Sequence, residues 1–138
     1  MPIRLHCHKG LGAAVTGTAL VAADNFSARY DLDRSKGTFS RPSHKLFGES
    51  FADRILVLDT AKGGVATAWM LHDTKSRGIV PRALIFNRVN PIIPQGAVFA
   101  GVALVDRFAG NVTALFRTGD ELRVNPAAGT VEILNRDI

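Results

Sequence analysis

Residues 54–71 read RILVLDTAKGGVATAWML, and this stretch decides how the chain folds. Its first part, residues 54–59, is a continuous apolar run of strand length, which is typical of a central strand covered on both faces. After the turn, apolar residues recur near helical spacing from Val65 to Arg77, and Gly78 stands where a helix usually ends. The sequence therefore predicts a buried strand, a glycine turn and a helix in succession.

A second buried strand is expected directly after that helix. Pro81 follows the helix, and ALIFNR at residues 83–88 is again an apolar run of strand length. Two strands joined through a helix in this way usually pair in parallel. The chain thus predicts a strand–helix–strand unit, and GVALVD at residues 101–106 adds another strand.

Further strands flank this unit on both sides. Residues 2–8 are extended in character, and AVTGTALVAA at residues 14–23 is rich in small and β-branched residues. Alternating runs at residues 122–124 and 131–134 are joined by an Asn-Pro and glycine turn, which predicts a closing hairpin. We therefore predict a single compact α/β domain over residues 1–138, built around a central mixed sheet.

The long connection from Asn25 to Glu49 has few periodic apolar positions, so we expect a surface loop, and loops of such length are usually functional. This segment carries the densest group of basic residues in the chain, namely Arg29, Arg34, Lys36, Arg41 and Lys45. Two readings fit the basic group: a solvated loop, or a patch that attracts an anionic substrate or an acidic partner.

Composition excludes several classes of protein. Hydrophobic residues make up 46% of the 138 residues and charged residues 21%, which is typical of a folded chain. Cys7 is the single cysteine, and it can form neither an internal disulfide nor a metal cluster by itself. The sequence has no apolar run of membrane-spanning length and no signal-peptide core at residues 1–10, so we expect a cytoplasmic protein. The net charge of +5 is spread along the chain, which does not favour nucleic-acid binding.

The glycine turn has a composition suited to binding an anion. Backbone N–H groups at a helix N-terminus are unsatisfied, and glycines allow a ligand to approach them closely. Lys62 supplies a full charge, Gly63, Gly64 and Val65 supply backbone N–H groups, and Thr67 supplies a hydroxyl. The alternative is that the glycines only form a tight turn between strand and helix. The lysine precedes the glycines, unlike in a nucleotide-binding P-loop, so we do not expect NTP hydrolysis.

Histidines offer a second set of candidates. His6 and His8 would lie on one face of a strand, but a third metal ligand is not apparent, and we predict no metal site on this chain. His44 lies in the long polar segment beside Lys45. We predict that His44 and Arg41 contact the substrate.

Five stretches together resemble the small-subunit, or swivel-domain, family of aconitase X: GTALV, FSARYDLDRSKGTF, HKLFGESFADRILVLDTAKGG, RGIVPRALIF and IIPQGAVFAGVALVD. The resemblance covers roughly residues 10–135. It implies a swivelling β/β/α domain that packs against a larger subunit, and that this large subunit holds an iron–sulfur cluster. It also implies a dehydration reaction, since the known substrate classes of the family include cis-3-hydroxyproline and phosphorylated mevalonate.

The chain departs from the family pattern in the glycine turn. The resemblance implies serines after the Lys-Gly pair, one of which acts as the catalytic acid or base. Here Gly64, Val65 and Ala66 occupy these positions, and none of them can transfer a proton. Three outcomes remain open: Thr67 has the role, the large subunit supplies it, or this subunit serves different chemistry.

The leading hypothesis is a small subunit of a two-chain hydro-lyase that dehydrates a small hydroxy acid and is inactive alone. The alternative is a non-catalytic anion-binding or regulatory module derived from that family. We expect the large subunit to bind near residues 39–50 and 62–70, where aromatic side chains could serve as anchors. These are Phe39, Phe47, Phe51 and Trp69, although Phe51 and Trp69 also fit a place in the core.

Overall fold

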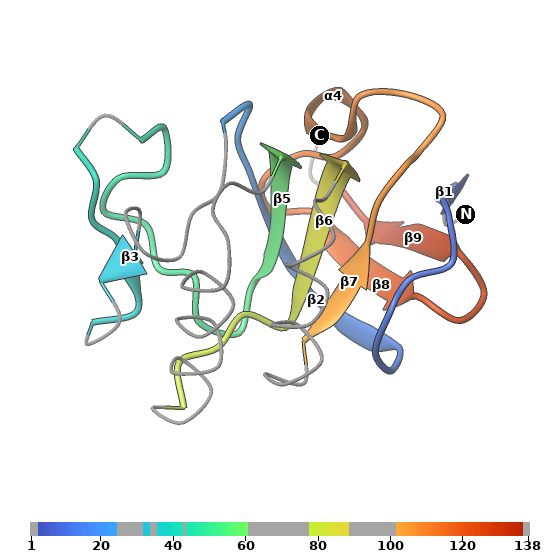
Figure 1. Cartoon of the computed structure of the whole chain (residues 1–138), viewed down its shortest axis with the longest axis horizontal. Coiled ribbons are helices and arrows are strands. Elements are labelled where there is room, and N and C mark those ends of the chain that lie inside the picture. The colour runs from blue at the N-terminus through green and yellow to red at the C-terminus, as the bar shows by residue number, and fades with distance from the viewer. Residues whose placement is uncertain are drawn as a thin grey trace.

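A mixed sheet of seven strands runs through the described part of the chain, in the order β1-β9-β8-β2-β5-β6-β7 (Figure 1). The computed structural model describes residues 3–24, 32–33, 36–42, 44–60, 78–88 and 102–136. The sheet has a parallel half and an antiparallel half, so the expectation of a central mixed sheet is confirmed.

The parallel half contains the apolar runs that the sequence singled out. Its strands are β2 (Val15–Val21), β5 (Ile55–Thr60), β6 (Ala83–Arg88) and β7 (Ala103–Val105). Each pairs in parallel with the next, with Leu56 opposite Leu84 and Leu84 opposite Leu104. The expected parallel pairing of the two buried strands is confirmed. The expected helix between them, residues 65–77, lies outside the described residues.

The antiparallel half is formed by the two ends of the chain. The hairpin of β8 (Glu121–Asn125) and β9 (Thr130–Asn135) confirms the closing hairpin, and β1 (Ile3–His6) pairs with β9. Strand β2 joins the two halves, because its first residues pair with β8 in antiparallel fashion and its last residues pair with β5 in parallel.

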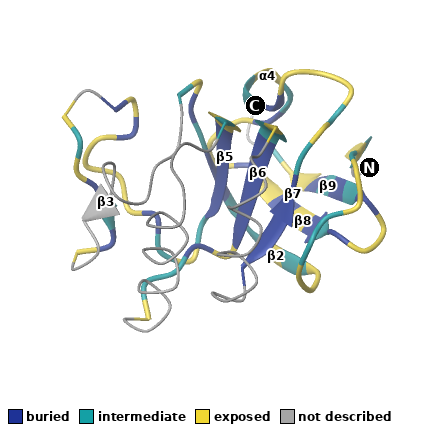
Figure 2. Cartoon of the chain, in the orientation of Figure 1, coloured by how far each residue is buried: buried dark blue, intermediate teal, exposed yellow. Residues whose placement is uncertain are grey.

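The core lies on both faces of the parallel strands (Figure 2). Alternation along β5 sends Leu56 and Leu58 to one face and Ile55 and Val57 to the other, and all four are fully buried. The second face is covered by helix α4 (Val112–Leu115) together with Phe116. The sequence did not predict this helix.

The described residues between 32 and 51 differ in two ways from what the sequence led us to expect. Phe39 is 1% exposed and packs in the core, so it is not a surface anchor for a partner. Phe51 is 0% exposed and takes the place in the core that was its alternative, whereas Trp69 lies outside the described residues. The segment is also more than a surface loop: β3 (Leu32–Asp33) pairs with β4 (Thr38–Phe39), and these strands lie to one side of the main sheet (Figure 1). The buried phenylalanines lack a regular spacing because turns separate them. Phe47 does remain on the surface, at 57% exposed.

Gly10 marks a place where two backbones meet. The segment before β2 crosses beside β7, and Leu11 exchanges both backbone hydrogen bonds with Leu104. A Cβ atom at Gly10 would overlap the carbonyl oxygen of Leu104. The glycine therefore permits this contact.

Candidate functional site

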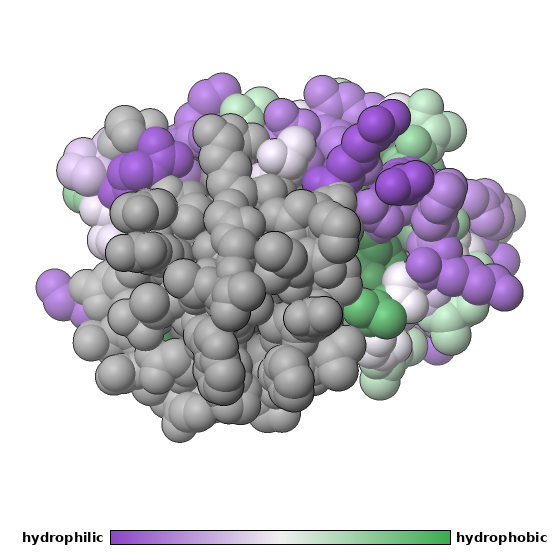
Figure 3. All heavy atoms as spheres, in the orientation of Figure 1, coloured by the Kyte–Doolittle hydropathy of each residue, from purple (hydrophilic) through white to green (hydrophobic). Residues whose placement is uncertain are grey.

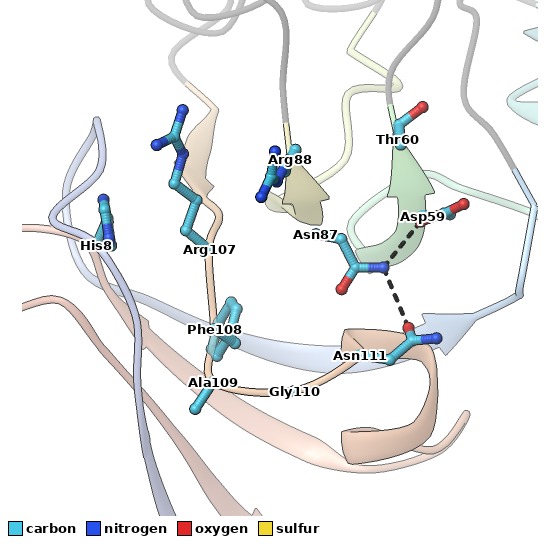
Figure 4. A pocket seen from close by; sticks show the side chains of 10 residues that line it. All are labelled: His8, Asp59, Thr60, Asn87, Arg88, Arg107, Phe108, Ala109, Gly110 and Asn111. Atoms are coloured by element: carbon cyan, nitrogen blue, oxygen red, sulfur yellow. Dashed lines mark hydrogen bonds between the residues drawn. The ribbon is translucent and has the colours of Figure 1, made fainter.

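A polar cleft of about 660 Å³ lies where the parallel strands β5 and β6 end. In parallel sheets, ligands bind at the carboxyl ends of the strands. Hydrophilic residues gather along this edge of the molecule (Figure 3). Ten described residues line the cleft (Figure 4): His8, Asp59, Thr60, Asn87, Arg88, Arg107, Phe108, Ala109, Gly110 and Asn111.

The side-chain amide of Asn87 organises one end of the cleft. Its Nδ2 donates to Asp59 Oδ1 at 2.8 Å and to Asn111 Oδ1 at 3.1 Å (Figure 4). Its Oδ1 accepts from the backbone N–H of Val112 at 2.8 Å. One side chain thus ties together the ends of β5 and β6 and the start of α4.

Strand alternation explains why these groups meet. Asp59 and Asn87 follow Val57 and Ile85, which point to the face of the sheet that α4 covers, so their side chains reach the same side. Asn111 caps α4 by accepting from the Thr113 backbone N–H at 3.0 Å. The Asp59 carboxylate is exposed, yet its orientation is set by the amide of Asn87.

The other end of the cleft is cationic. Arg88 ends β6 and is exposed, and Arg107 follows β7 with its side chain 56% exposed. The Arg107 backbone N–H donates to the Asn87 carbonyl at 3.0 Å, which places the two strand ends at the same level. His8 lies beyond Arg107 in Figure 4 and is also exposed.

Arg107 has an unusual backbone. Its φ of 61° lies in the left-handed region, which residues with a side chain adopt at some cost in strain. Its Nε lies 3.6 Å from Asp106 Oδ2, so the neighbouring carboxylate orients the guanidinium. The left-handed turn redirects the chain out of β7 and across the mouth of the cleft toward Asn111.

Cys7 directly precedes the cleft residue His8 in the sequence, but its thiol is poorly suited to chemistry. Burial, and then the negative charge of Asp106, raises the pKa of its thiol to about 11. The thiol is therefore protonated at neutral pH, whereas the thiolate is the form that reacts and binds metals.

The two described residues of the predicted substrate site meet at Asp24, just after β2. Arg41 NH2 lies 3.8 Å from Asp24 Oδ1, and His44 Nε2 lies 3.9 Å from Asp24 Oδ2. The Asp24 carbonyl in turn accepts from the Asp59 backbone N–H at 2.9 Å. Both predicted residues therefore lie around a carboxylate that is attached to the same edge of the sheet as the cleft.

His44 is placed differently from the expectation of an exposed loop residue. It is 3% exposed and stacks on Phe39 with 4.8 Å between ring centroids. Its Nδ1 accepts from the Leu46 backbone N–H at 3.0 Å, so the neutral ring carries its proton on Nε2, which faces Asp24. Contact of His44 and Arg41 with a substrate stays a prediction.

The predicted turn itself, Lys62, Gly63, Gly64, Val65 and Thr67, lies outside the described residues. It begins two residues after Thr60, which lines the cleft. Sequence reasoning missed Asn87, Arg88, Arg107 and Asn111. A usable signal existed for three of these four residues, since the polar pairs Asn87-Arg88 and Asp106-Arg107 directly follow the apolar runs of β6 and β7.

In the described part of the chain, no three or more His, Cys, Asp or Glu side chains are grouped closely enough to hold a metal ion. No helix among those residues is long and apolar enough to cross a membrane.

Residues 4–133 match the family model of the aconitase X swivel domain. The chain belongs to this family. The phosphomevalonate dehydratase small subunit of Methanococcoides burtonii is 28% identical over 97% of this chain and 98% of that protein. The corresponding small subunit of Pyrococcus horikoshii is 32% identical over 91% of this chain and 92% of that protein. The family expected from the sequence is confirmed, as is the expectation of a dehydratase subunit.

A solved structure supports the same conclusion for the fold. The crystal structure of Thermococcus kodakaraensis aconitase X in its holo form matches with a TM-score of 0.89 and 26% identity. The match covers 96% of this chain and 99% of that one. The expected swivel fold is therefore confirmed over nearly the whole chain.

Proposed function

We propose that this chain is the small, swivelling subunit of an aconitase X-type hydro-lyase that dehydrates a small hydroxy acid. The observation that carries the proposal is the match to the family and to its small subunits over nearly the whole alignment. The small-subunit relatives are covered almost completely, and they cover almost the whole of this chain. The chain therefore aligns with these small subunits over nearly their whole length, and we propose that its partner is a large subunit of the same family.

The described cleft offers groups suited to such a reaction. Dehydration needs a group that takes a proton from carbon, an acid for the departing hydroxyl, and donors that hold the substrate carboxylate. The Asp59 carboxylate, oriented by Asn87, is suited to proton transfer, and the arginine end is suited to holding an anion. We propose that the turn beginning at Lys62 adds its amides and charge at the same edge.

A second candidate function depends on which group acts as the acid or base in the proposed dehydration. Gly64, Val65 and Ala66 stand where the family resemblance implies serines. Thr67 is the nearest hydroxyl in the turn, and we propose it for proton transfer. If none of Asp59, Thr67 and the partner transfers the proton, the chain acts as an anion-binding or regulatory module.

An iron–sulfur cluster, implied by the family resemblance, would supply the Lewis acid that draws away the hydroxyl. The whole chain has one cysteine, whose thiol is protonated at neutral pH. The donor set of this chain does not fit a cluster, which needs several thiolates. We therefore propose that the large subunit holds it.

The test is co-purification of the chain with its partner from the native host, followed by a dehydration assay on the complex. Phosphomevalonate and other small hydroxy acids are offered, and the unsaturated product is measured. We expect a larger chain of the aconitase X family to co-purify, the complex to be active, and the isolated small chain to be inactive. Recovery of this chain alone, or turnover by the isolated chain, would contradict the proposal.

Two substitutions in the complex then test the turn. Gly64→Val places a side chain where the substrate is expected to approach, so KM should rise strongly. Thr67→Val keeps the shape but removes the hydroxyl, so kcat should fall with little change in KM if Thr67 transfers a proton. Wild-type kinetics in both variants would mean that the turn only connects strand and helix.

A further inference from the structure

We propose that Phe47 anchors this chain to the large subunit of the proposed complex, by inserting its ring into an apolar pocket of that partner. The inference rests on the proposed function and identifies the surface through which the two chains assemble. Phe47 lies in the turn formed by residues 44–49, which we call the Phe47 turn. This turn follows β4 and lies with β3 to one side of the main sheet (Figure 1).

Phe47 is the most exposed large apolar side chain in the described part of the chain, at 57%. The other two, Ile3 and Leu134, are 50% and 43% exposed and belong to β1 and β9, which pair at the opposite end of the sheet. Single apolar residues on a surface are common, so exposure alone does not indicate a binding site. The way in which the backbone holds Phe47 is the deciding feature.

The backbone of the Phe47 turn is fixed by hydrogen bonds along its whole length. Each of the six backbone N–H groups from residue 44 to residue 49 donates a bond of 2.8–3.2 Å within the chain. The acceptors, in the order of their donors, are Arg41 O, Asp24 Oδ2, His44 Nδ1, His44 O, Phe39 O and Leu46 O. The turn therefore has one shape before any partner binds.

Two neighbours direct the ring of Phe47 outward. Leu46 is 6% exposed and packs in the core with Phe51, so the preceding side chain attaches the turn to the domain. Gly48 has a φ of 85°, in the left-handed region that favours glycine, and its N–H donates to the Phe39 carbonyl at 2.8 Å. The chain thus reverses directly after Phe47. The turn buries Leu46 and presents Phe47.

A rigidly presented aromatic ring has the properties of an interface hot spot. Ordering side chains and loops opposes association, and a turn that is already ordered avoids that loss. A few aromatic residues surrounded by a polar rim carry most of the binding energy of many interfaces. Lys45 and Glu49, on either side of Phe47 in the sequence, are exposed and charged, and they form such a rim.

The position of the Phe47 turn indicates which partner it binds. Asp24 Oδ2 accepts from the Lys45 N–H at 3.2 Å, and the Asp24 carbonyl accepts from the N–H of the cleft residue Asp59 at 2.9 Å. One residue therefore connects the turn to the edge of the sheet that carries the cleft. A large subunit that closes over the cleft approaches the Phe47 turn from the same edge.

The small apolar area of the turn argues against a second copy of this chain as the partner. A stable interface buries about 800 Å² on each side, far more than one phenylalanine between charged neighbours can supply. The Phe47 turn is sufficient only as part of a larger contact. A partner that also covers the cleft provides that contact, and the large subunit is the chain proposed to do so.

The test measures the affinity between the two subunits. The large subunit identified by co-purification is tagged and immobilised, and binding of this chain is followed by surface plasmon resonance. The variants are F47A, which removes the ring, and F47L, which keeps an apolar side chain. L134A is the matched control, because it shortens an exposed apolar side chain in β9, away from the proposed interface. Circular dichroism gives the melting temperature of each variant.

We expect F47A to raise Kd by roughly 10- to 100-fold and L134A to change it by less than about twofold, with F47L between them. Because Phe47 is exposed, its removal should change the melting temperature by no more than about 2 °C. In the dehydration assay, the concentration of this chain that gives half-maximal activity should rise in F47A by the same factor as Kd. Activity should return as more of the variant is added.

Three results would overturn the inference while leaving the proposed function intact. The first is a Kd for F47A equal to that of the wild type or of L134A. The second is a weaker binding of F47A together with a melting temperature lowered by more than about 5 °C, which would assign Phe47 to the stability of the fold. The third is a wild-type dimer, seen by size-exclusion chromatography, that F47A dissociates, which would make a second copy the partner.

Failure of the proposed function gives a different result. A wild-type chain that binds no large subunit of the aconitase X family would contradict the proposed function and this inference together. Binding of the wild type that F47A leaves unchanged would contradict this inference alone.

Discussion

Replacing Asn87 by aspartate should expose how the cleft is held together. The change keeps the size of the side chain and still offers an acceptor to the Val112 N–H. It removes both bonds that Nδ2 donates, to Asp59 at 2.8 Å and to Asn111 at 3.1 Å. It also places a carboxylate beside that of Asp59.

The magnitude follows from these contacts. The two lost hydrogen bonds contribute about 1 kcal/mol each at an accessible site. Two like charges 2.8 Å apart repel by about 1.5 kcal/mol at a dielectric constant near 80 and by about 6 kcal/mol near 20. Because Asp59 is exposed, the lower value applies more closely. We therefore expect N87D to lower the free energy of unfolding by about 3–4 kcal/mol at pH 7.

The effect should also depend on pH in a definite direction. The folded variant brings two carboxylates together, so it binds a proton more tightly than the unfolded chain does. A native state that binds more protons gains stability as the pH falls. The difference between N87D and wild type should therefore shrink as the pH is lowered from 7 toward 4.

The assay is urea denaturation followed by circular dichroism at several pH values. The control is N125D, because Asn125 uses its Oδ1 as an acceptor for the Ala128 N–H, and a carboxylate can accept the same bond. If N87D lowers the free energy of unfolding no more than N125D does, the role of the Asn87 amide is refuted. If the effect of N87D on the free energy of unfolding does not change with pH, the close approach of the two carboxylates is refuted.

Two further predictions concern the stability of the fold. Asp120 is 1% exposed and forms a bidentate ion pair with Arg136, so Asp120→Asn should lower the free energy of unfolding by about 3 kcal/mol at pH 7 in urea denaturation. Burial raises the pKa of Asp120, but hydrogen bonds from Arg136 and from the Arg117 N–H outweigh it, and the pKa lies below its usual value. The stabilisation by the Asp120–Arg136 ion pair should thus be complete above about pH 5 and disappear as the pH falls through that lowered pKa. If Asp120→Asn lowers the free energy of unfolding as much at low pH as at pH 7, this reasoning is contradicted. Gly10→Ala should lower the melting temperature by several degrees more than the control Gly110→Ala, whose added Cβ would have no neighbour closer than 3.7 Å. Equal shifts in melting temperature would contradict the close contact between Gly10 and Leu104.

The sequence predicted the sheet well because its buried strands are continuous apolar runs. Strands β5 and β6 are fully buried over four residues each, and this pattern is visible without any structure. The closing hairpin was also predictable, since its alternation and its turn residues are local signals. The family resemblance then added the swivel fold and the reaction class.

The cleft could not be predicted in the same way, because it depends on contacts between distant residues. Asn87 is 28 residues from Asp59 and 24 from Asn111, and only the register of the sheet brings them together. His44 was expected on the surface because its neighbours are polar. Its ring is buried because Phe39, five residues earlier, provides an aromatic surface on which it stacks.

The pairing of the two ends of the chain has a consequence for how the protein is made. Strand β2 needs β8 as its antiparallel partner, with Val15 opposite Val124, and β1 needs β9, with Ile3 opposite Ile133. At about 5–20 residues per second, a ribosome takes on the order of 5–20 s to synthesise the intervening chain. During that time β1 and β2 lack their antiparallel partners, and unpaired strand edges promote aggregation. Docking onto a large subunit before the last hairpin is complete would therefore present an unfinished sheet.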